Sequence, residues 1–222
     1  MPTICVCGPD GCGKSTVIEA IGEWCQITGR EHVIAHNPGS TNLGKLLRRL
    51  IKDPGFFGEV GYNGIVITPL VERLLLLCDN AAFIDTIHRP NQDKWVIMDR
   101  SNFISDIAYG QAAGVDMEQM KKLHSLIKDP PKIDQLFILK CDFETAKARR
   151  TNRKSSEKCR IEDNGDVFFK KVHHIYDKLL EDYNEYLQNF VAVENGKLCA
   201  EYVEASSQPG EVVSTIISRL GE

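Results

Sequence analysis

The stretch Gly8-Pro9-Asp10-Gly11-Cys12-Gly13-Lys14-Ser15-Thr16 decides the fold of this chain, because its spacing matches G-x-x-x-x-G-K-S. An apolar run from Pro2 to Cys7 precedes it, and an apolar-periodic run from Val17 to Ile27 follows it. The first run is typical of a buried strand and the second of a helix. The context therefore predicts a phosphate-binding loop at the start of a helix.

The residue types of this loop suit a nucleoside triphosphate and Mg²⁺. Its glycines let the backbone N–H groups turn inward, and the following helix adds its own N–H groups and dipole. Lys14 is expected to reach the β- and γ-phosphates, and the Ser15 hydroxyl is expected to hold the metal. The residues expected to contact the nucleotide are Gly8, Gly11, Cys12, Gly13, Lys14, Ser15 and Thr16.

Length and composition place the chain among ordinary globular proteins. Its 222 residues suffice for one domain, and no Pro-rich or Ser/Gly-rich linker divides them, so we expect 1–222 to form a single domain. The net charge of -4 disfavours nucleic acid and membranes as partners. No run approaches the roughly 20 apolar residues of a membrane span, and no secretory leader is visible. We expect a cytoplasmic protein whose scattered cysteines are free thiols, with Cys12 the one to test for oxidation.

Apolar patterning alternates between strands and helices along the chain. Such strands are joined by right-handed crossovers into a mainly parallel sheet that helices cover on both faces. The predicted fold class is therefore α/β, with a five-stranded sheet between two helical layers. Further strands are expected at His32–His36, Lys94–Met98, Gln135–Leu139 and around Tyr202–Val203, and further helices at Thr41–Lys52, Val66–Ile87, 101–113, Met117–Lys128, from about Phe143, Val167–Asn189 and Glu211–Leu220.

Two other charged groups are expected at the same edge of the sheet as the loop, because ligands bind at the carboxyl ends of parallel strands. Asp99 and Arg100 follow the strand Lys94–Met98; the carboxylate suits Mg²⁺ together with Ser15, and the guanidinium suits a second phosphate. A basic run at about 149–163 interrupts two helices. We expect it to be a mobile lid whose arginines meet the charge of a phosphoryl-transfer transition state.

Taken in order, these motifs resemble the thymidylate kinases, within the nucleoside monophosphate kinase group of phosphate-loop enzymes. The resemblance extends over nearly the whole chain. It implies the three-layer P-loop kinase fold with an Arg-rich lid. The residues that carry it include Pro38-Gly39-Ser40-Thr41, Asp99-Arg100 with Ser105 and Ala108-Tyr109, Arg160-Ile161-Glu162, and Glu204 to Pro209.

The resemblance implies transfer of the ATP γ-phosphate to a deoxynucleoside monophosphate, with dTMP as the best single candidate. It places Asp10 and Arg100 near the acceptor phosphate, and Tyr109 where it disfavours a ribose 2′-hydroxyl. Gly11 occupies the place of a loop arginine found in some members, so the catalytic arginines are expected in the lid. A homodimer through helices such as Val66–Ile87 is also implied. The catalytic candidates are Lys14, Asp10, Arg100, Arg149, Arg153 and Arg160.

The positions expected to read the acceptor base depart from the family. Leu76 and Asn80 stand where a stacking phenylalanine and a base-reading arginine are usual, and Asp106 stands where an amide commonly meets the base. Because a carboxylate prefers a hydrogen-bond donor opposite it, a base with a different edge or a modified pyrimidine stays open. The candidates for acceptor binding are Asp10, Leu76, Asn80, Arg100, Ser105, Asp106 and Tyr109.

Two alternative functions stay open on the sequence. One is a kinase that phosphorylates a hydroxyl of a deoxynucleoside, or of a hydroxymethylated pyrimidine in a nucleotide or in DNA, which needs a carboxylate as general base. The acid expected before Pro38 is Asn37, which counts against it, although Asp10 or Asp106 could substitute. The other is a P-loop NTPase switch without kinase activity. The absence of an Asn-Lys-x-Asp signature counts against it.

Overall fold

The computed structural model describes residues 1–53, 55–56, 66–152, 160–206 and 208–221. Its centre is a five-stranded sheet in the order β2-β3-β1-β4-β7, and every pairing between neighbouring strands is parallel. This arrangement confirms the predicted α/β class. The strands are β1 (Thr3–Cys7), β2 (His32–His36), β3 (Trp95–Asp99), β4 (Gln135–Lys140) and β7 (Ala200–Glu204).

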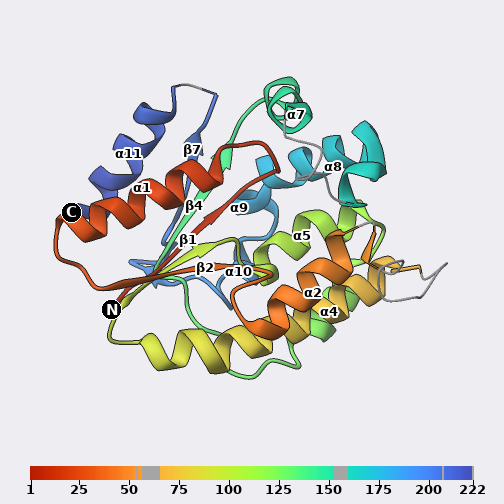
Figure 1. The fold of residues 1–222 in the computed structure, drawn as a ribbon, viewed down its shortest axis with the longest axis horizontal. Coiled ribbons are helices and arrows are strands. Elements are labelled where there is room, and N and C mark those ends of the chain that lie inside the picture. The colour runs from red at the N-terminus through yellow and green to blue at the C-terminus, as the bar shows by residue number, and fades with distance from the viewer. Residues whose placement is uncertain (54, 57–65, 153–159, 207, 222) are drawn as a thin grey trace.

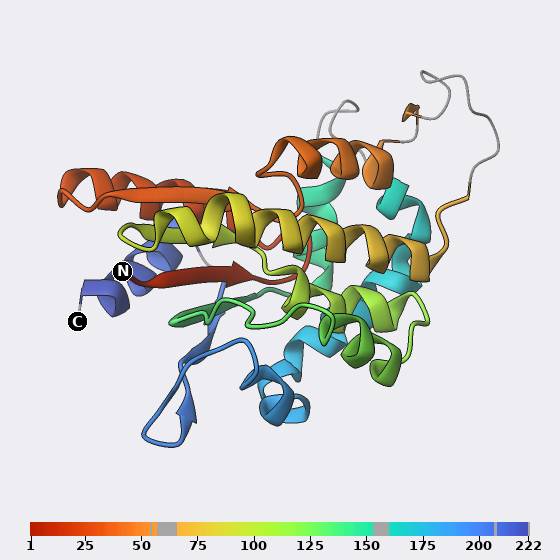
Figure 2. The same cartoon turned by 90° about the horizontal axis from the view of Figure 1, so that it is seen from below.

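Helices cover both faces of the sheet (Figures 1 and 2). On one face lie α1 (Lys14–Ile27) and α11 (Pro209–Gly221), and on the other lie α5 (Asn102–Ala112) and α8 (Gly165–Asp177). No helix in the described part of the chain is long and apolar enough to cross a membrane. The remaining helices are α2 (Asn42–Lys52), α4 (Pro69–Phe83), α6 (Met117–His124), α7 (Phe143–Thr151), and the short α9 (Leu179–Asp182) and α10 (Asn184–Leu187).

Alternation along the strands explains the two layers of core. In β1, Ile4 and Val6 join the cluster under α1 and α11, whereas Cys5 and Cys7 join the cluster under α5 and α8. Successive side chains of a strand point to opposite faces, so one apolar run contributes to both clusters. All four side chains are fully buried, as a sheet covered on both faces requires.

The helix predicted at Val66–Ile87 differs from the structure at both ends. It begins as α4 at Pro69, where Thr68 is the N-cap and its hydroxyl accepts the N–H of Val71 at 3.4 Å. Proline suits the first helical position because it has no N–H to leave unpaired. After Phe83 the chain continues as a π-helix (Ile84–His88) and a 3₁₀ turn (Arg89–Asn91).

Two other predicted helices are too long. The run Met117–Lys128 is helical only in α6, up to His124. The run Val167–Asn189 was expected as one helix, but α8 ends at Asp177 and two single-turn helices follow. Lys178 and Tyr183 leave helical geometry, which lets the chain turn and bury Leu187 and Val191 in the core beneath α5.

Candidate active site

The predicted phosphate loop joins β1 to α1 and depends on its glycines. Gly8, Gly11 and Gly13 have φ values of 143°, 96° and 88°, which side chains rarely adopt. A Cβ on Gly11 would also collide with the backbone of Ala146 at α7. The loop therefore packs directly against α7, and position 11 has no room for an arginine.

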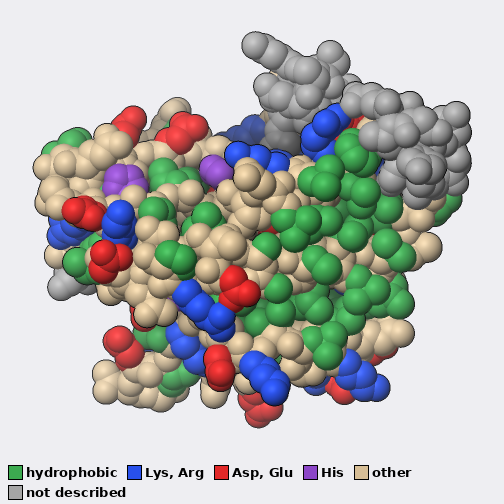
Figure 3. Space-filling view, turned by 60° about the horizontal axis from the view of Figure 1, so that its bottom comes forward, with side chains coloured by type: hydrophobic (Ala, Val, Ile, Leu, Met, Phe, Trp, Pro, Cys, Tyr) green, Lys and Arg blue, Asp and Glu red, His purple; other side chains and the backbone are tan. Residues whose placement is uncertain are grey.

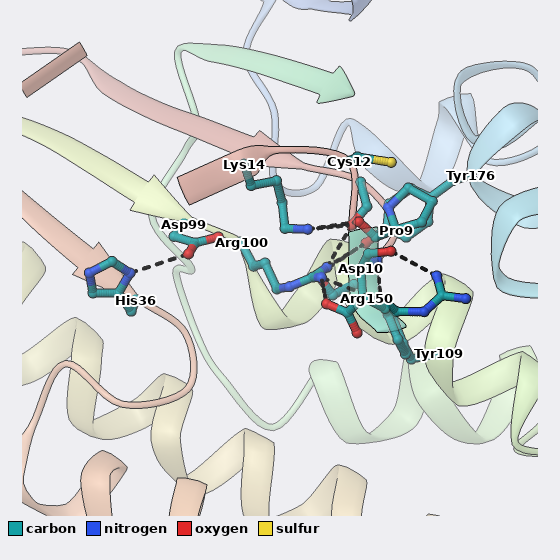
Figure 4. Close-up of polar contacts among 12 residues, drawn as sticks. Pro9, Asp10, Cys12, Lys14, His36, Asp99, Arg100, Tyr109, Arg150 and Tyr176 are labelled. Atoms are coloured by element: carbon teal, nitrogen blue, oxygen red, sulfur yellow. Dashed lines mark hydrogen bonds and ion pairs between the residues drawn. The ribbon is translucent and has the colours of Figure 1, made fainter. Parts of the chain in front are cut away.

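Lys14 lies folded over this loop (Figure 4). Its Nζ donates to the carbonyl oxygens of Gly8 at 3.2 Å and Pro9 at 2.8 Å. Burial and the nearby Arg100 charge lower the pKa of Lys14 to about 8. Ser15 and Thr16, which follow it in the first turn of α1, are exposed.

Arg100 brings the end of β3 to the phosphate loop (Figure 4). Its backbone is left-handed, with φ of 71°, and its guanidinium donates to Gly8 O at 2.8 Å and Asp10 Oδ1 at 2.5 Å. Burial would raise the pKa of Asp10, but the charges of Arg100 and Lys14 lower it well below its ordinary range. Asp10 is thus a permanent carboxylate that orients Arg100.

Two phenol groups complete the surroundings of Arg100. The Tyr109 hydroxyl accepts from the backbone N–H of Asp10 at 3.1 Å and from Arg100 at 3.3 Å. The Tyr176 hydroxyl accepts from Arg100 at 3.4 Å and donates to Ser105 Oγ at 3.2 Å. The structure therefore brings together Asp10, Arg100, Ser105 and Tyr109, all of which are candidates for acceptor binding.

In the part of the chain that the structure describes, three hollows surround these residues. The phosphate hollow lies between the loop, β3 and α2; the inner hollow continues from it between α2, α4 and α5; the outer hollow lies between the loop and the start of α11. The phosphate hollow is lined by Asp10, Gly11, Gly13, Lys14, Ser15, His36, Asn37, Arg48, Lys52, Asp99, Arg100 and Arg149. The inner hollow shares Asp10, Asn37, Lys52 and Arg100 with it and adds Leu76, Ser105, Asp106 and Tyr109 among others. Cys12, Gly13, Thr16, Arg149 and Ala205 are among those lining the outer hollow.

Two cations of α2 that the sequence analysis missed face the phosphate hollow. Arg48 donates to Pro38 O at 3.0 Å, and Lys52 lines both the phosphate hollow and the inner hollow. Their four-residue spacing puts them on one side of a helix, which is the signal that could have found them. They oppose the phosphate loop, so positive charge lies on both sides of the phosphate hollow.

Asp99 ends β3 beside His36 of β2. Its Oδ2 lies 3.3 Å from His36 Nδ1, and this hydrogen bond raises the pKa of His36. Burial would raise the pKa of Asp99, but the bond to His36 and the charge of Lys14 lower it. The Oδ1 atom of Asp99 is buried and has no hydrogen-bond partner among the described residues.

The predicted lid arginines lie in different places. Arg149 borders the phosphate and outer hollows and donates to Ala205 O at 3.1 Å. Arg160 instead donates to Ile51 O at 2.9 Å and to Glu72 Oε2 at 2.6 Å, beside α2 and α4. Arg153, with the middle of the predicted lid, lies outside the described residues.

Arg150, which the sequence analysis did not single out, is buried behind the phosphate loop. It donates to the carbonyl oxygen of Asp10 at 2.9 Å, and its guanidinium lies 4.2 Å from the ring centre of Phe169. The phosphate loop is thereby attached to α7 and α8. No motif marks this residue, because its role depends on the packing of two helices.

Of the three positions expected to contact the acceptor base, two lie at the inner hollow and one does not. Leu76 and Asp106 line the inner hollow, whereas Asn80 is buried but is not among the lining residues. Arg73, one turn before Leu76, also lines the hollow and donates to Asp106 Oδ1 at 2.6 Å. The signal for Arg73 was an arginine directly before the apolar run Leu74–Leu77, since a charge that is buried beside such a run needs a partner.

A parallel sheet with a phosphate loop after its first strand, facing an arginine and a second hollow, defines a P-loop nucleotide kinase. The family model described as thymidylate kinase matches residues 6–198, and the chain belongs to the thymidylate kinase family. It is a phosphotransferase.

Individual relatives agree with this assignment. A protein of Thermococcus kodakarensis described as a probable thymidylate kinase is 30% identical over 217 residues, covering 97% of both chains. The thymidylate kinase of Prochlorococcus marinus is 34% identical over 173 residues, or 74% of both chains. The crystal structure of thymidylate kinase from Ehrlichia chaffeensis has the same fold, with a TM-score of 0.66 at 21% identity, over 99% of this chain and 98% of that one.

Proposed function

We propose that this chain transfers the γ-phosphate of ATP to the phosphate of dTMP. The position of Arg100 supports this proposal most directly, because it lines both the phosphate hollow and the inner hollow. A guanidinium at that junction puts positive charge beside both the donor and the acceptor phosphates, and neutralising their repulsion is a main task of a phosphoryl-transfer enzyme. Donor ATP would lie along the phosphate loop with its adenosine end in the outer hollow.

The acceptor needs no general base, because a phosphate monoester is already ionised at neutral pH. The protein has to hold two polyanions in line and neutralise their repulsion, for which Arg48, Lys52 and Arg100 are placed around the phosphate hollow. Asp10 has too low a pKa to take a proton from a hydroxyl efficiently. This counts against the alternative in which a hydroxyl is phosphorylated. Tyr109, at the inner hollow, would disfavour a ribose 2′-hydroxyl.

The residues present fit Mg²⁺. Magnesium prefers a few hard oxygen ligands together with phosphate oxygens and water. Ser15 and Asp99 line the same hollow, and the buried Oδ1 of Asp99 has no hydrogen-bond partner in the described part of the chain. These two side chains would hold the ion, directly or through water, and the ion would neutralise charge on the donor phosphates.

The lid arginines would supply positive charge at the transferred phosphoryl group. Arg149 already borders the phosphate hollow, whereas Arg160 would first have to leave Glu72. We expect Arg153→Ala to lower kcat more than it raises KM, since a contact made only in the transition state affects kcat. The opposite pattern in steady-state kinetics would remove Arg153 from this role.

The function is tested with a coupled ADP-release assay, using ATP and Mg²⁺ against ribo- and deoxynucleoside monophosphates, nucleosides and hydroxymethylpyrimidine substrates. We expect dTMP to be turned over fastest. Lys14→Ala should lower kcat at least about 100-fold, the usual effect of losing one preorganised charge contact. The control is Lys121→Ala, which removes an exposed lysine paired with Glu118. The proposal is wrong if no monophosphate is consumed above the background hydrolysis.

We also propose that a second copy of the chain binds the apolar face of α2 and α4, as the family resemblance implies. Figure 3 shows hydrophobic side chains gathered on this side of the molecule. Contiguous exposed apolar surface of this kind marks interaction sites. The face consists of Leu43, Leu46, Leu70, Val71 and Leu74, which are 39% to 51% exposed.

A further inference from the structure

Arg73 is a buried arginine of α4 that the proposed mechanism does not use. Only 3% of it is exposed, and it lines the inner hollow together with Leu76, Asp106 and Tyr109. Its Cδ lies 3.4 Å from the position that a Cβ on Gly110 would occupy. A Cβ at that position of α5 would be in ordinary contact with Arg73 and would collide only with Sδ of Met120, so the helices pack closely around the arginine.

Side chains from two helices contact the guanidinium, and side chains from two more helices support one of these contacts. Nη1 donates to Asp106 Oδ1 at 2.6 Å, and Nη2 is paired with Glu72. The other oxygen of Asp106 lies 3.3 Å from Nε2 of His124, whose Nδ1 lies 2.6 Å from the Tyr186 hydroxyl. Both oxygens of Asp106 therefore have partners, and the carboxylate orients Arg73.

The third nitrogen of the Arg73 guanidinium is Nε. This nitrogen is buried and has no hydrogen-bond partner among the described residues. An unpaired charged donor away from water is costly, so such atoms are rare unless something else binds there. Arg73 lines the inner hollow, so a molecule bound in this hollow would lie beside its side chain.

The position of Arg73 within the inner hollow decides which part of a nucleotide it meets. Asp10 and Arg100 belong also to the phosphate hollow, whereas Arg73 and Asp106 belong to the inner hollow alone. A monophosphate held at Arg100 would therefore direct its base toward Arg73. In a pyrimidine nucleotide the group at C4 points away from the sugar, so it is this group that faces the far end.

We infer that Arg73, positioned by Asp106, reads the acceptor base by donating a hydrogen bond to a carbonyl oxygen at C4. This inference rests on the proposed nucleoside monophosphate kinase function. A 4-oxo pyrimidine, as in dTMP or dUMP, accepts this bond, whereas the 4-amino group of dCMP places a donor against a donor. Asn80, the position aligned with the family's base-reading arginine, is buried without lining the hollow, so this chain reads the base from two helical turns earlier.

The test is a double-mutant cycle in which the protein and the substrate are changed singly and in combination. kcat/KM is measured for dTMP and for the analogue that carries hydrogen in place of the 4-oxygen, in the wild type and in Arg73→Gln. In the wild type, loss of the 4-oxygen should lower kcat/KM between about 10-fold and 150-fold, the range for a hydrogen bond to a charged group. In Arg73→Gln the same change should lower kcat/KM at least about tenfold less than in the wild type, because the contact with the 4-oxygen is already missing, and the N3–H that the analogue also lacks affects both proteins alike.

Other substrates and variants separate recognition from folding. In Arg73→Gln the ratio of kcat/KM for dTMP to that for dCMP should fall at least about tenfold, with dUMP following dTMP. If the single variant does not fold, Arg73→Gln with Asp106→Asn replaces the buried ion pair by two neutral amides and gives the same readout. The matched control is Arg89→Gln with Asp85→Asn, an exposed pair on the continuation of the same helix.

Each outcome decides one of the two hypotheses. If the wild type phosphorylates no 4-oxo pyrimidine monophosphate, the proposed function is wrong. If it does, but dTMP and dCMP lose activity equally in the variants and the 4-oxygen effect persists in Arg73→Gln, then Arg73 only joins the helices. A 4-oxygen effect that disappears together with Arg73 establishes the contact.

Discussion

Arg100 has a larger role in the site than the Asp99-Arg100 motif indicated. Its left-handed backbone costs about 1–3 kcal/mol for a residue with a side chain, so the surroundings must stabilise it. They do so through the hydrogen bonds from its guanidinium to Gly8, Asp10 and the hydroxyls of Tyr109 and Tyr176. The turn directs the side chain from the end of β3 back to the phosphate loop, where both phosphates would meet.

We expect Lys14 to make the proposed ATP binding depend on pH. Its pKa is lowered to about 8 in the free protein, and the charge of a bound triphosphate would raise it again. At about pH 7 Lys14 is protonated in both states, so binding takes up no proton there. Above about pH 8 binding must protonate Lys14, and the affinity should fall up to about tenfold per pH unit.

This prediction is checked by titration calorimetry of ATP in buffers that differ in ionisation enthalpy. Proton uptake should be close to zero at about pH 7 and approach one proton at about pH 9. Lys14→Arg should show no such uptake, because a guanidinium does not titrate in this range. Equal uptake by wild type and Lys14→Arg would mean that another group is responsible.

Cys12 and Cys141 join the phosphate loop to the end of β4 through two buried thiols, whose Sγ atoms are 2.8 Å apart. Hydrogen peroxide should oxidise them to a disulfide, the two thiols losing their hydrogens and the peroxide becoming two waters. We expect ATP affinity to fall about tenfold, since the loop can then no longer adjust around phosphates. Mass spectrometry detects the disulfide, and ATP titration before and after its reduction measures the change in affinity. Cys141→Ser should abolish the effect and Cys78→Ser should not; an unchanged affinity in the oxidised protein would contradict it.

Sequence and structure agree best for residues fixed by the backbone. Lys14, Asp10 and Arg100 lie together as predicted, because the carboxyl ends of parallel strands meet at one edge of the sheet. Arg73 and Arg48 were missed, because their roles depend on which face α4 and α2 turn toward the hollows. A sequence motif predicts the geometry of a loop, but it does not predict how helices pack against one another.

At the scale of elements, apolar periodicity located the helices but not their ends. The pattern Val167–Asn189 continues through Lys178 and Tyr183, where the chain turns to reach the core. The small hairpin β5 (Val193–Glu194) and β6 (Lys197–Leu198) was also missed, although Asn195-Gly196 is a strong turn signal. Their φ values of 49° and 77° fit the turn that this dipeptide favours. Tertiary packing determines where the predicted helix ends, whereas local turn chemistry determines the hairpin.

Gly44 controls how closely α2 packs on α4. A Cβ there would collide with the Asp79 carboxylate of α4 and come within 3.0 Å of Thr41 Oγ1, which caps α2. Gly44→Ala should therefore destabilise the protein by about 1–3 kcal/mol, the usual cost of overpacking. Because α2 carries Arg48 and Lys52, the KM for the acceptor should rise too. Thermal unfolding and steady-state kinetics measure both effects.

The matched control is Gly210→Ala in the first turn of α11. A Cβ at this position meets no atom within 4 Å, so the alanine should stabilise the helix by about 0.5–1 kcal/mol. If Gly44→Ala raises the melting temperature as Gly210→Ala does, helix propensity decides the result and the contact with Asp79 does not matter.

For the whole molecule, the arrangement of α2 and α4 links the active site to the outer surface. One side of this pair lines the inner hollow through Lys52, Arg73 and Leu76, and its other side carries the exposed apolar face. A partner bound to that face would limit how far the two helices can move. Dimerisation should therefore affect acceptor binding more than ATP binding, since the phosphate loop lies on β1 and α1.

Leu46→Glu combined with Leu74→Glu tests this coupling. These side chains are 51% and 42% exposed in the single chain, so charges there should leave folding intact but separate the two copies. Light scattering after size-exclusion chromatography should give a dimer mass for wild type and a monomer mass for the double variant. The control is Val193→Glu, at a similarly exposed position on β5, which should stay dimeric. In the monomer, KM for dTMP should rise at least about threefold while KM for ATP changes little, because only α2 and α4 lose their support. A wild-type monomer would contradict the proposed dimer, and a double variant that stays dimeric would place the interface elsewhere. A double variant that is monomeric but has an unchanged KM for dTMP would show that the inner hollow needs no support from a second copy.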